Sequence, residues 1–221
     1  MAMKNDTLEA FKKAVETEWP SPPFKRQLAP CEDKFVGIIR RNSSGLYEFD
    51  SMAAFVYKPI PPHGDNSRLL VVLESPHEKE YLGENSPVPA NGATGTNIRS
   101  YLGSLLKGLP SLQQAADLDV ILVNAVPYQC SQGAKLTNHE NRAKRDRVFR
   151  AAFCAASPKP GVEFERRVSR YVRAHDIVIN CCTKGVTVES LRDLVHDSLA
   201  RLSEKLRCPQ DQQREELESS G

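Results

Sequence analysis

The sequence lacks the cysteine spacing that marks a structural zinc site or an iron–sulfur cluster. Its six cysteines stand at positions 31, 130, 154, 181, 182 and 208, and no two of them form a Cys-x-x-Cys pair. A chain of 221 residues in a reducing compartment needs no disulfide to hold its core. We therefore expect free thiols, no bound metal and no cofactor.

Long apolar runs and a strong net charge are also absent. No stretch of about 18 apolar residues occurs, which excludes a membrane span, and the first 20 residues have no apolar signal-peptide core. The 30 Lys and Arg residues nearly balance the 28 Asp and Glu residues, which excludes a strongly basic, histone-like protein. We expect a cytoplasmic protein with no membrane partner.

Three short apolar runs carry the clearest structural signal. They span residues 69–73, 120–123 and 177–179 and do not alternate with polar residues, a pattern typical of strands buried on both faces of a parallel sheet. Helical patterns at 95–109 and 162–174 lie between them. This order predicts an α/β fold, a three-layer sandwich with a central, mainly parallel sheet flanked by helices.

The residues before position 68 are predicted as an N-terminal extension, 1–67, of a single domain. An amphipathic helix is expected at 7–18, with Thr7 as its N-cap. The turn sequence RNSSG at 41–45 favours a short strand or a hairpin.

The single predicted domain covers residues 1–207, with its core at 68–207. It ends in an amphipathic helix at 186–207. Residues 208–221 have almost no apolar content, so we expect a flexible tail there.

Polar segments follow each of the three predicted strands, at 74–78, 124–131 and 180–185. In an open α/β sheet the ligand crevice lies outside the carboxyl ends of the strands. The three segments are therefore expected to converge on one site, in which Glu74 supplies a carboxylate and Asn124 supplies an amide.

A glycine-containing loop, at 89–95, precedes the helical pattern that follows the first strand. Its glycines permit tight turns. The helix, capped by Thr96 or Asn97, would offer free N–H groups to an anion. The loop matches neither the P-loop nor the dinucleotide-binding glycine pattern, and a simple turn explains it equally well.

A basic segment at 135–150 follows the second strand. It contains six basic residues and only two acidic ones. A groove that binds the DNA backbone needs such a patch, because phosphate contacts supply most of the sequence-independent affinity. The alternative is the solvated face of a helix.

These features together resemble the uracil-DNA glycosylase superfamily over residues 68–185. The segment LESPH at 73–77 is similar to the superfamily's Gly-Glu-Ala-Pro-Gly type of loop after the first strand, and NGATGTNIRSYL at 91–102 is similar to its glycine-rich loop and helix. Asn124 matches the Asn that reads the extruded base. The resemblance implies a uracil-DNA glycosylase-like fold and a monofunctional enzyme that flips out a modified base and hydrolyses its N-glycosidic bond, leaving an abasic site.

The sequence departs from the superfamily at two motifs. The His-Pro-Ser type of loop is missing, because His196 falls inside a predicted helix, and residues 89–92 (PANG) replace the stretch that usually supplies an aromatic stacked on uracil. A pocket without that ring is roomier. The expected substrate is therefore a bulky modified pyrimidine such as glucosylated hydroxymethylcytosine in phage DNA, which an antiviral branch of the superfamily removes.

Glu74 and Asn124 are the predicted catalytic residues. A carboxylate can stabilise the oxocarbenium charge and activate water, and an amide suits a base edge or a water molecule. Tyr81 or Tyr128 could replace the missing stacking ring, and for His77 the alternative is a loop histidine that bonds to the backbone. The full set of expected substrate or DNA contacts is Ser75, Pro76, His77, Tyr81, Asn91, Gly92, Thr94, Tyr128, Gln129, Ser131, Lys184, Lys135, Arg142, Lys144 and Arg145.

The expected partner is DNA, bound by a monomer. Two other functions stay open: a nucleoside or nucleotide N-glycosidic hydrolase or transferase, which would not need the basic segment, and a non-catalytic nucleic-acid-binding module. A metal-dependent nuclease is a weaker alternative, since Glu74, Glu78 and Glu80 cluster but no Asp/His ligand set accompanies them.

Overall fold

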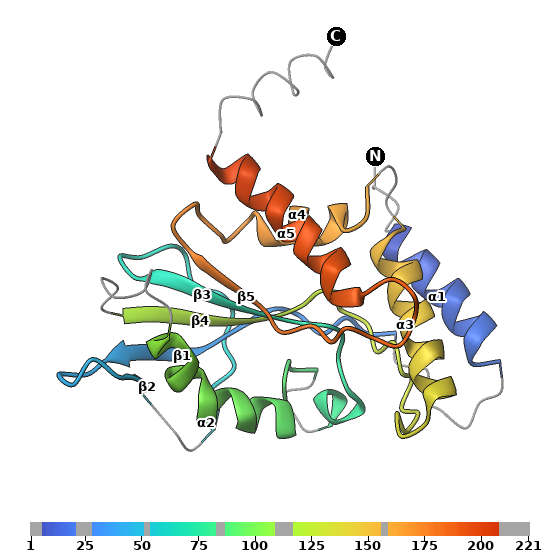
Figure 1. Ribbon diagram of the computed structural model, residues 1–221, viewed down its shortest axis with the longest axis horizontal. Coiled ribbons are helices and arrows are strands. Elements are labelled where there is room, and N and C mark those ends of the chain that lie inside the picture. The colour runs from blue at the N-terminus through green and yellow to red at the C-terminus, as the bar shows by residue number, and fades with distance from the viewer. Residues whose placement is uncertain are drawn as a thin grey trace, which may run out of the picture.

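The computed structural model describes residues 6–20, 28–50, 54–82, 87–108, 117–155 and 159–207. The tail expected at 208–221 lies outside these residues. Within them the chain forms an α/β fold with an open five-stranded sheet and helices on both of its faces (Figure 1).

The sheet has the strand order β2-β1-β4-β3-β5. Its strands are β1 (Lys34–Arg41), β2 (Tyr47–Phe49), β3 (Ser67–Leu73), β4 (Asp117–Asn124) and β5 (Ile177–Asn180). Strand β3 pairs in parallel with both β4 and β5, whereas β1 is antiparallel to both β2 and β4. Four strands therefore share one direction and β1 runs against them, which confirms the mainly parallel sheet.

The apolar residues of β3 are divided between two cores, as expected for a strand buried on both faces. Leu69, Val71 and Leu73 pack in the cluster that includes α2 (Ala93–Lys107), and Leu70 and Val72 pack in the opposite one. This division explains the unbroken run of apolar residues in the sequence.

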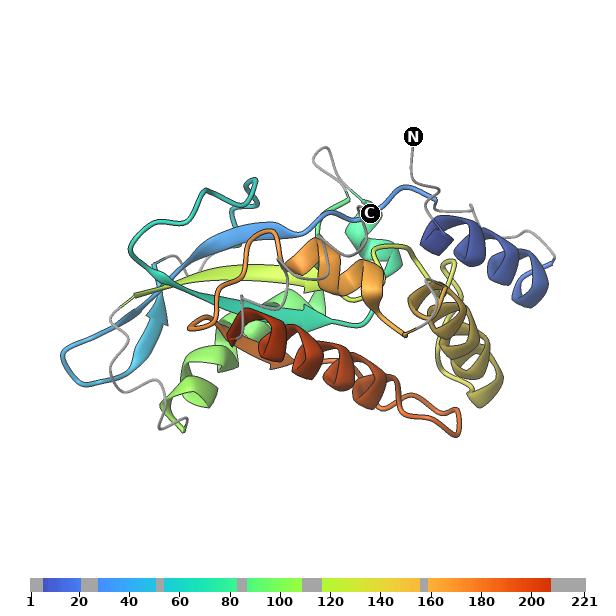
Figure 2. The same ribbon diagram turned by 90° about the horizontal axis from the view of Figure 1, so that it is seen from above.

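The second core contains residues of α1 (Asp6–Glu18), α3 (His139–Phe153), α4 (Val162–Val168) and α5 (Leu191–Arg207). Figure 1 shows α4 and α5 on the other side of the sheet from α2, and Figures 1 and 2 show α1 and α3 beyond one end of the sheet. Helix α1 packs against α3. In the described part of the chain no helix combines the length and apolar character needed to cross a bilayer.

Strand β1 lies inside the sheet, although the sequence analysis assigned it to an extension. It hydrogen-bonds to β4 across Lys34–Leu122 to Arg40–Asp117, and it forms with β2 the hairpin that the RNSSG turn favours. The sheet is thus built from both sides of position 68.

The boundaries of several helices differ from the predictions. Thr7 does not cap α1: it lies within that helix, on the buried stripe with Phe11 and Val15. Helix α2 begins at Ala93 after Gly92, so neither Thr96 nor Asn97 caps it. Helix α4 ends at Val168, short of the predicted residue 174.

Helix α5 also begins later than predicted, at Leu191 rather than 186. The reason is tertiary: the Val186 N–H donates to Asp146 of α3 at 2.6 Å instead of entering a helical turn.

Candidate active site

The carboxyl ends of β3, β4 and β5 meet at one edge of the sheet. The N–H of Ala125 donates to the Leu73 carbonyl at 2.7 Å, and the N–H of Cys181 donates to the Val72 carbonyl at 2.8 Å. The segments that follow the three strands therefore start side by side, as the sequence predicts.

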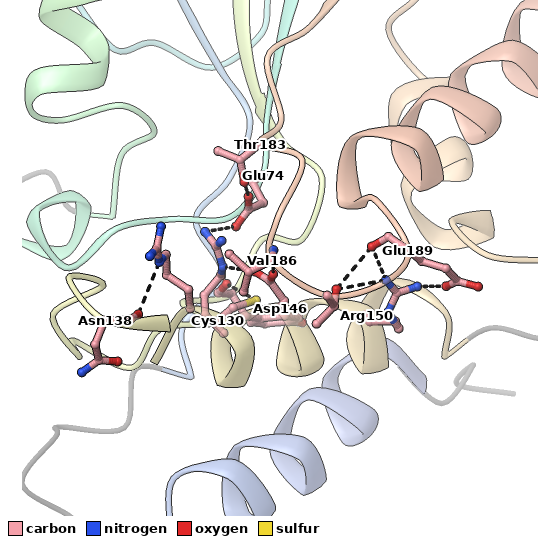
Figure 3. A network of polar contacts seen from close by, with 12 residues as sticks. Glu74, Cys130, Asn138, Asp146, Arg150, Thr183, Val186 and Glu189 are labelled. Atoms are coloured by element: carbon pink, nitrogen blue, oxygen red, sulfur yellow. Dashed lines mark hydrogen bonds and ion pairs between the residues drawn. The ribbon is translucent and has the colours of Figure 1, made fainter. Parts of the chain in front are cut away.

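Glu74, directly after β3, is held by side chains from two other elements. Its Oε1 atom lies 2.6 Å from Nη1 of Arg145 on α3, and its Oε2 atom accepts a hydrogen bond from the Thr183 hydroxyl after β5 (Figure 3). Only 8% of Glu74 is exposed. Burial raises the pKa of this carboxyl, while Arg145 and Thr183 oppose the shift.

Asp146 extends this network toward the loop before α5. It accepts from Nε of Arg145 at 2.6 Å and from the backbone N–H of Val186 at 2.6 Å, and it is fully buried. Farther along α3, Arg150 forms an ion pair with Glu189 in the same loop (Figure 3). Helix α3 thereby fixes the segment that carries Thr183.

Glu80 is a second buried carboxylate at this end of the sheet. It lies in the short 3-10 helix η1 (Glu78–Tyr81) and is 5% exposed. Burial raises the pKa of Glu80 to about 7, against the influence of the His77 and Ala90 N–H groups and of Asn124. The Cys31 thiol donates to its Oε2 atom at 3.8 Å.

Asn124, the last residue of β4, carries an unused amide. Its side chain is 1% exposed, and neither Oδ1 nor Nδ2 has a hydrogen-bond partner among the described residues. Burial raises the pKa of both Glu80 and Cys31, and the nearby Asn124 amide opposes these shifts. An unpaired buried amide costs about 1–3 kcal/mol, and such groups cluster at functional sites.

The backbone that faces Glu80 is strained and tightly packed. Ala90 has a φ of 56°, in the left-handed region that favours glycine. Its carbonyl presses on α2 at Gly95, where an added Cβ would lie 2.1 Å from the oxygen. Gly95 therefore allows the close approach that places the Ala90 N–H toward Glu80.

The main chain of Asn124 is also held by a side chain from outside the sheet. The Arg167 guanidinium on α4 donates to the Asn124 carbonyl and lies 3.4 Å from Oδ2 of Asp33. Asp33 accepts a further hydrogen bond from the Tyr171 hydroxyl. Burial raises the pKa of Asp33, and Arg167 opposes that shift. This cluster positions the end of β4.

Several predicted contact residues hold loops in place. His77 Nδ1 accepts from the Lys79 N–H at 3.3 Å, which is the alternative role that the sequence analysis considered. Asn91 donates to the carbonyls of Lys79 and Leu82. The Gln129 side-chain oxygen, oriented to suit its neighbours, accepts from the Glu78 N–H at 2.9 Å.

The two tyrosines proposed as stacking rings lie in different surroundings. Tyr128 is 4% exposed and stacks on Phe11 of α1, with ring centroids 4.8 Å apart. Tyr81 is half-buried, and its hydroxyl donates to the Ala29 carbonyl at 3.0 Å. Tyr128 is therefore part of the core in this conformation.

The remaining predicted contact residues range from buried to exposed. Pro76 and Ser131 are buried and Ser75 is half-buried. Burial raises the pKa of the Cys130 thiol, and the neighbouring Ser75 opposes that shift. The exposed residues are Gly92, Thr94, Lys135, Arg142 and Lys184.

The basic segment at 135–150 forms ion pairs over most of its length. Lys144 pairs with Glu140, Arg147 with Glu18, and Arg150 with Glu189. Arg145, expected to contact DNA, instead lies inside and pairs with Glu74. Lys135 and Arg142 are the two basic residues of the segment for which the described residues show no ion pair.

Sequence reasoning missed the residues that define the chemistry of the site: Glu80, Thr183, Asp146, Cys31 and Arg167. Thr183 was visible as part of a polar strand end. No sequence signal marked Glu80 as buried, because it directly follows two exposed charged residues, Glu78 and Lys79, and is turned inward by η1.

No metal site accompanies these acids in the described residues, where no group of three or more His, Cys, Asp or Glu side chains is arranged to hold an ion. In comparisons with protein-family profiles, with curated proteins and with solved structures, no match to this chain was found.

Proposed function

We propose that the protein is a DNA glycosylase that hydrolyses the N-glycosidic bond of a modified base and leaves an abasic site. The proposed substrate is a bulky modified pyrimidine, such as glucosylated hydroxymethylcytosine, in a uracil-DNA glycosylase-like fold. The observation that carries the proposal is the buried amide of Asn124, at the carboxyl edge of the sheet. It has no hydrogen-bond partner among the described residues and lies beside Glu80, whose pKa is raised to about 7.

The two carboxylates suit different steps of this reaction. As the C1′–N bond breaks, its electron pair goes to the base and positive charge develops on the sugar. The Glu74 carboxylate, paired with Arg145, supplies negative charge at this edge. Glu80 removes a proton from the water whose oxygen bonds to C1′, and that proton passes to the departing base.

Asn124 is the proposed reader of the base. An amide offers one acceptor and two donor hydrogens, which match the edge of a flipped pyrimidine. A bound base would supply the hydrogen-bond partners that the described residues do not provide for this amide. Because Glu74, Glu80 and Asn124 are all at least nine-tenths buried, binding requires the covering loops to move aside.

Abasic-site formation tests the proposal. DNA that contains uracil, hydroxymethylcytosine or glucosylated hydroxymethylcytosine is incubated with the protein and then cleaved with alkali. We expect strand breaks with a modified base, lost in Glu74→Gln, Glu80→Gln and Asn124→Ala. Glu78→Gln is the matched control, because Glu78 is an exposed carboxylate in the same 3-10 helix as Glu80.

The pH profile separates the two acids. If Glu80 is the base, the single-turnover rate of the wild type rises as pH passes about 7, where its carboxyl loses the proton. Intact DNA binding without strand breaks on any substrate would reject catalysis and favour the binding module.

One observation favours a second candidate, an N-glycosidic hydrolase or transferase that acts on free nucleosides or nucleotides. Four of the six basic residues at 135–150 are already paired with carboxylates, so this segment offers DNA less charge than its composition suggests. Release of base from free nucleotides, unaffected by competing DNA, would identify this activity.

A further inference from the structure

A cavity of about 150 Å³ lies behind the end of β4, apart from the acids described above. Its apolar walls come from the segment after β4, from the end of α3 and from α4. Its charged wall comes from α4 and the turn that follows. The lining includes Val126, Phe153, Phe164, Arg166, Arg167 and Arg170.

The positive charge of this cavity exceeds its negative charge. Arg166 pairs with Glu163 at 2.5 Å, and Arg167 lies 3.4 Å from Asp33. Arg170 is exposed and has no ion pair among the described residues. Three arginine side chains and one carboxylate, that of Glu163, thus line the cavity, and Asp33 pairs with Arg167 from outside it.

The volume limits what can occupy the cavity. A space of about 150 Å³ holds a group the size of a benzene ring, whereas pockets for drug-sized ligands measure about 300–1,000 Å³. A whole nucleotide does not fit, but a single tetrahedral anion with an apolar attachment does. Guanidinium groups bind the oxygens of phosphate in a planar, two-pronged geometry.

We propose that this arginine-lined cavity is a binding site for one phosphoryl group, with Arg170 as its principal cation. The group belongs either to a DNA backbone, a source that rests on the function proposed above, or to a small phosphorylated compound. Neither source requires Glu74 or Glu80 to take part.

Arg167 connects this cavity to the candidate active site. The same guanidinium that lines the cavity donates to the main-chain carbonyl of Asn124. A phosphoryl group that binds Arg167 would therefore change the hydrogen bond that Arg167 donates to Asn124. Occupancy of the cavity and the position of Asn124 are thereby coupled.

Calorimetric titration of the full chain with inorganic phosphate, at constant ionic strength, tests the site itself. We expect Arg170→Gln to weaken phosphate binding by about tenfold or more, the loss expected for one charge-assisted hydrogen bond. Arg173→Gln is the matched control: it removes the same charge three residues away, from an exposed side chain that lines a different cavity. Because Arg170 is exposed and without an ion pair in the described chain, the variant is expected to fold normally.

A second titration, with a short DNA duplex, identifies the source. If Arg170→Gln weakens duplex binding and inorganic phosphate competes with the duplex, the phosphoryl group is part of DNA. If phosphate binds through Arg170 and the duplex does not compete, the site takes a small phosphorylated compound. Absence of phosphate binding, or equal weakening by Arg173→Gln, would overturn the proposal. None of these readouts depends on base release, so they remain separate from the glycosylase assay.

Discussion

Two buried glutamates at the same end of the sheet have opposite surroundings. Glu74 has a guanidinium at 2.6 Å and a hydroxyl donor. Glu80 has a thiol, backbone N–H groups and the Asn124 amide around it, and the described residues offer it no ion pair. The difference shows which acid has a cation that opposes the effect of burial on its pKa and which acid has none among the described residues.

The two regions also differ in what they contribute to the free energy of unfolding. A buried ion pair with satisfied partners is neutral to mildly stabilising, but it becomes costly when one partner is removed. A carboxyl without a cation, next to an unpaired amide, lowers stability even in the intact protein. The Glu74 region thus supports the fold, and the Glu80 region depends on that support.

The largest expected effect comes from breaking the paired region. Arg145→Met leaves Glu74 and Asp146 buried without their shared cation, and we expect the free energy of unfolding to fall by about 4 kcal/mol. Urea titration at neutral pH measures this. Arg142→Met, an exposed position on the same helix, should change it by less than about 0.5 kcal/mol. Similar losses in both variants would contradict the role of the ion pair.

The unpaired region predicts a pH dependence of stability. The pKa of Glu80 is raised to about 7 in the folded state from an ordinary value of 4.5. Between these values only the unfolded chain releases the proton, so the free energy of unfolding falls as pH rises, and above about 7 the loss is complete. Its size is about 3 kcal/mol.

Unfolding of the wild type and of Glu80→Gln at about pH 5 and about pH 8 measures this contribution. We expect the variant to be the more stable of the two at the higher pH, and its stability to vary less with pH. A wild-type curve that matches the variant at both pH values would show that Glu80 keeps an ordinary pKa.

A smaller loss is expected where α2 backs the Glu80 region. Gly95→Ala places a methyl group against the Ala90 carbonyl and should lower the free energy of unfolding by about 2 kcal/mol, because backbone on both sides resists displacement. Gly64→Ala is the control, since nothing lies within 4 Å of its added Cβ. Thermal unfolding of both variants distinguishes close packing from a general effect of glycine replacement.

The smallest effect has the opposite sign. Asn124→Leu removes a buried amide that lacks partners and retains its branched shape, so we expect the protein to gain about 1 kcal/mol of stability. Base release should be lost at the same time. Destabilisation would mean that the amide has partners in solution and would weaken the case for a substrate-binding role.

The existence of three buried strands and the mainly parallel character of the sheet could be predicted, because the apolar runs reflect burial on both faces. The place of β1 could not, since its sequence does not indicate that it runs antiparallel beside β4. Helix ends were missed for a related reason: Thr7 is drawn into the α1–α3 interface, and Val186 is drawn to Asp146, by contacts distant in sequence.

The site could be predicted at the level of strand ends but not of side-chain partners. Glu74 directly follows β3 and Asn124 ends β4, and the parallel register of Leu73 with Asn124 places them at the same edge of the sheet. The burial of Glu80 and the inward turn of Arg145 depend on how η1 and α3 pack. A run of charges reports only composition, and here four of the six basic residues form ion pairs, three of them with acids from other elements.

The outer strands of the sheet have a consequence for the behaviour of concentrated solutions. Strands β2 and β5 have three and four residues, whereas the three interior strands have seven or eight. A short edge strand offers few unpaired N–H and carbonyl groups to a strand of another molecule. Native molecules should therefore resist edge-to-edge aggregation, and precipitation on heating is expected to begin only after the sheet has opened.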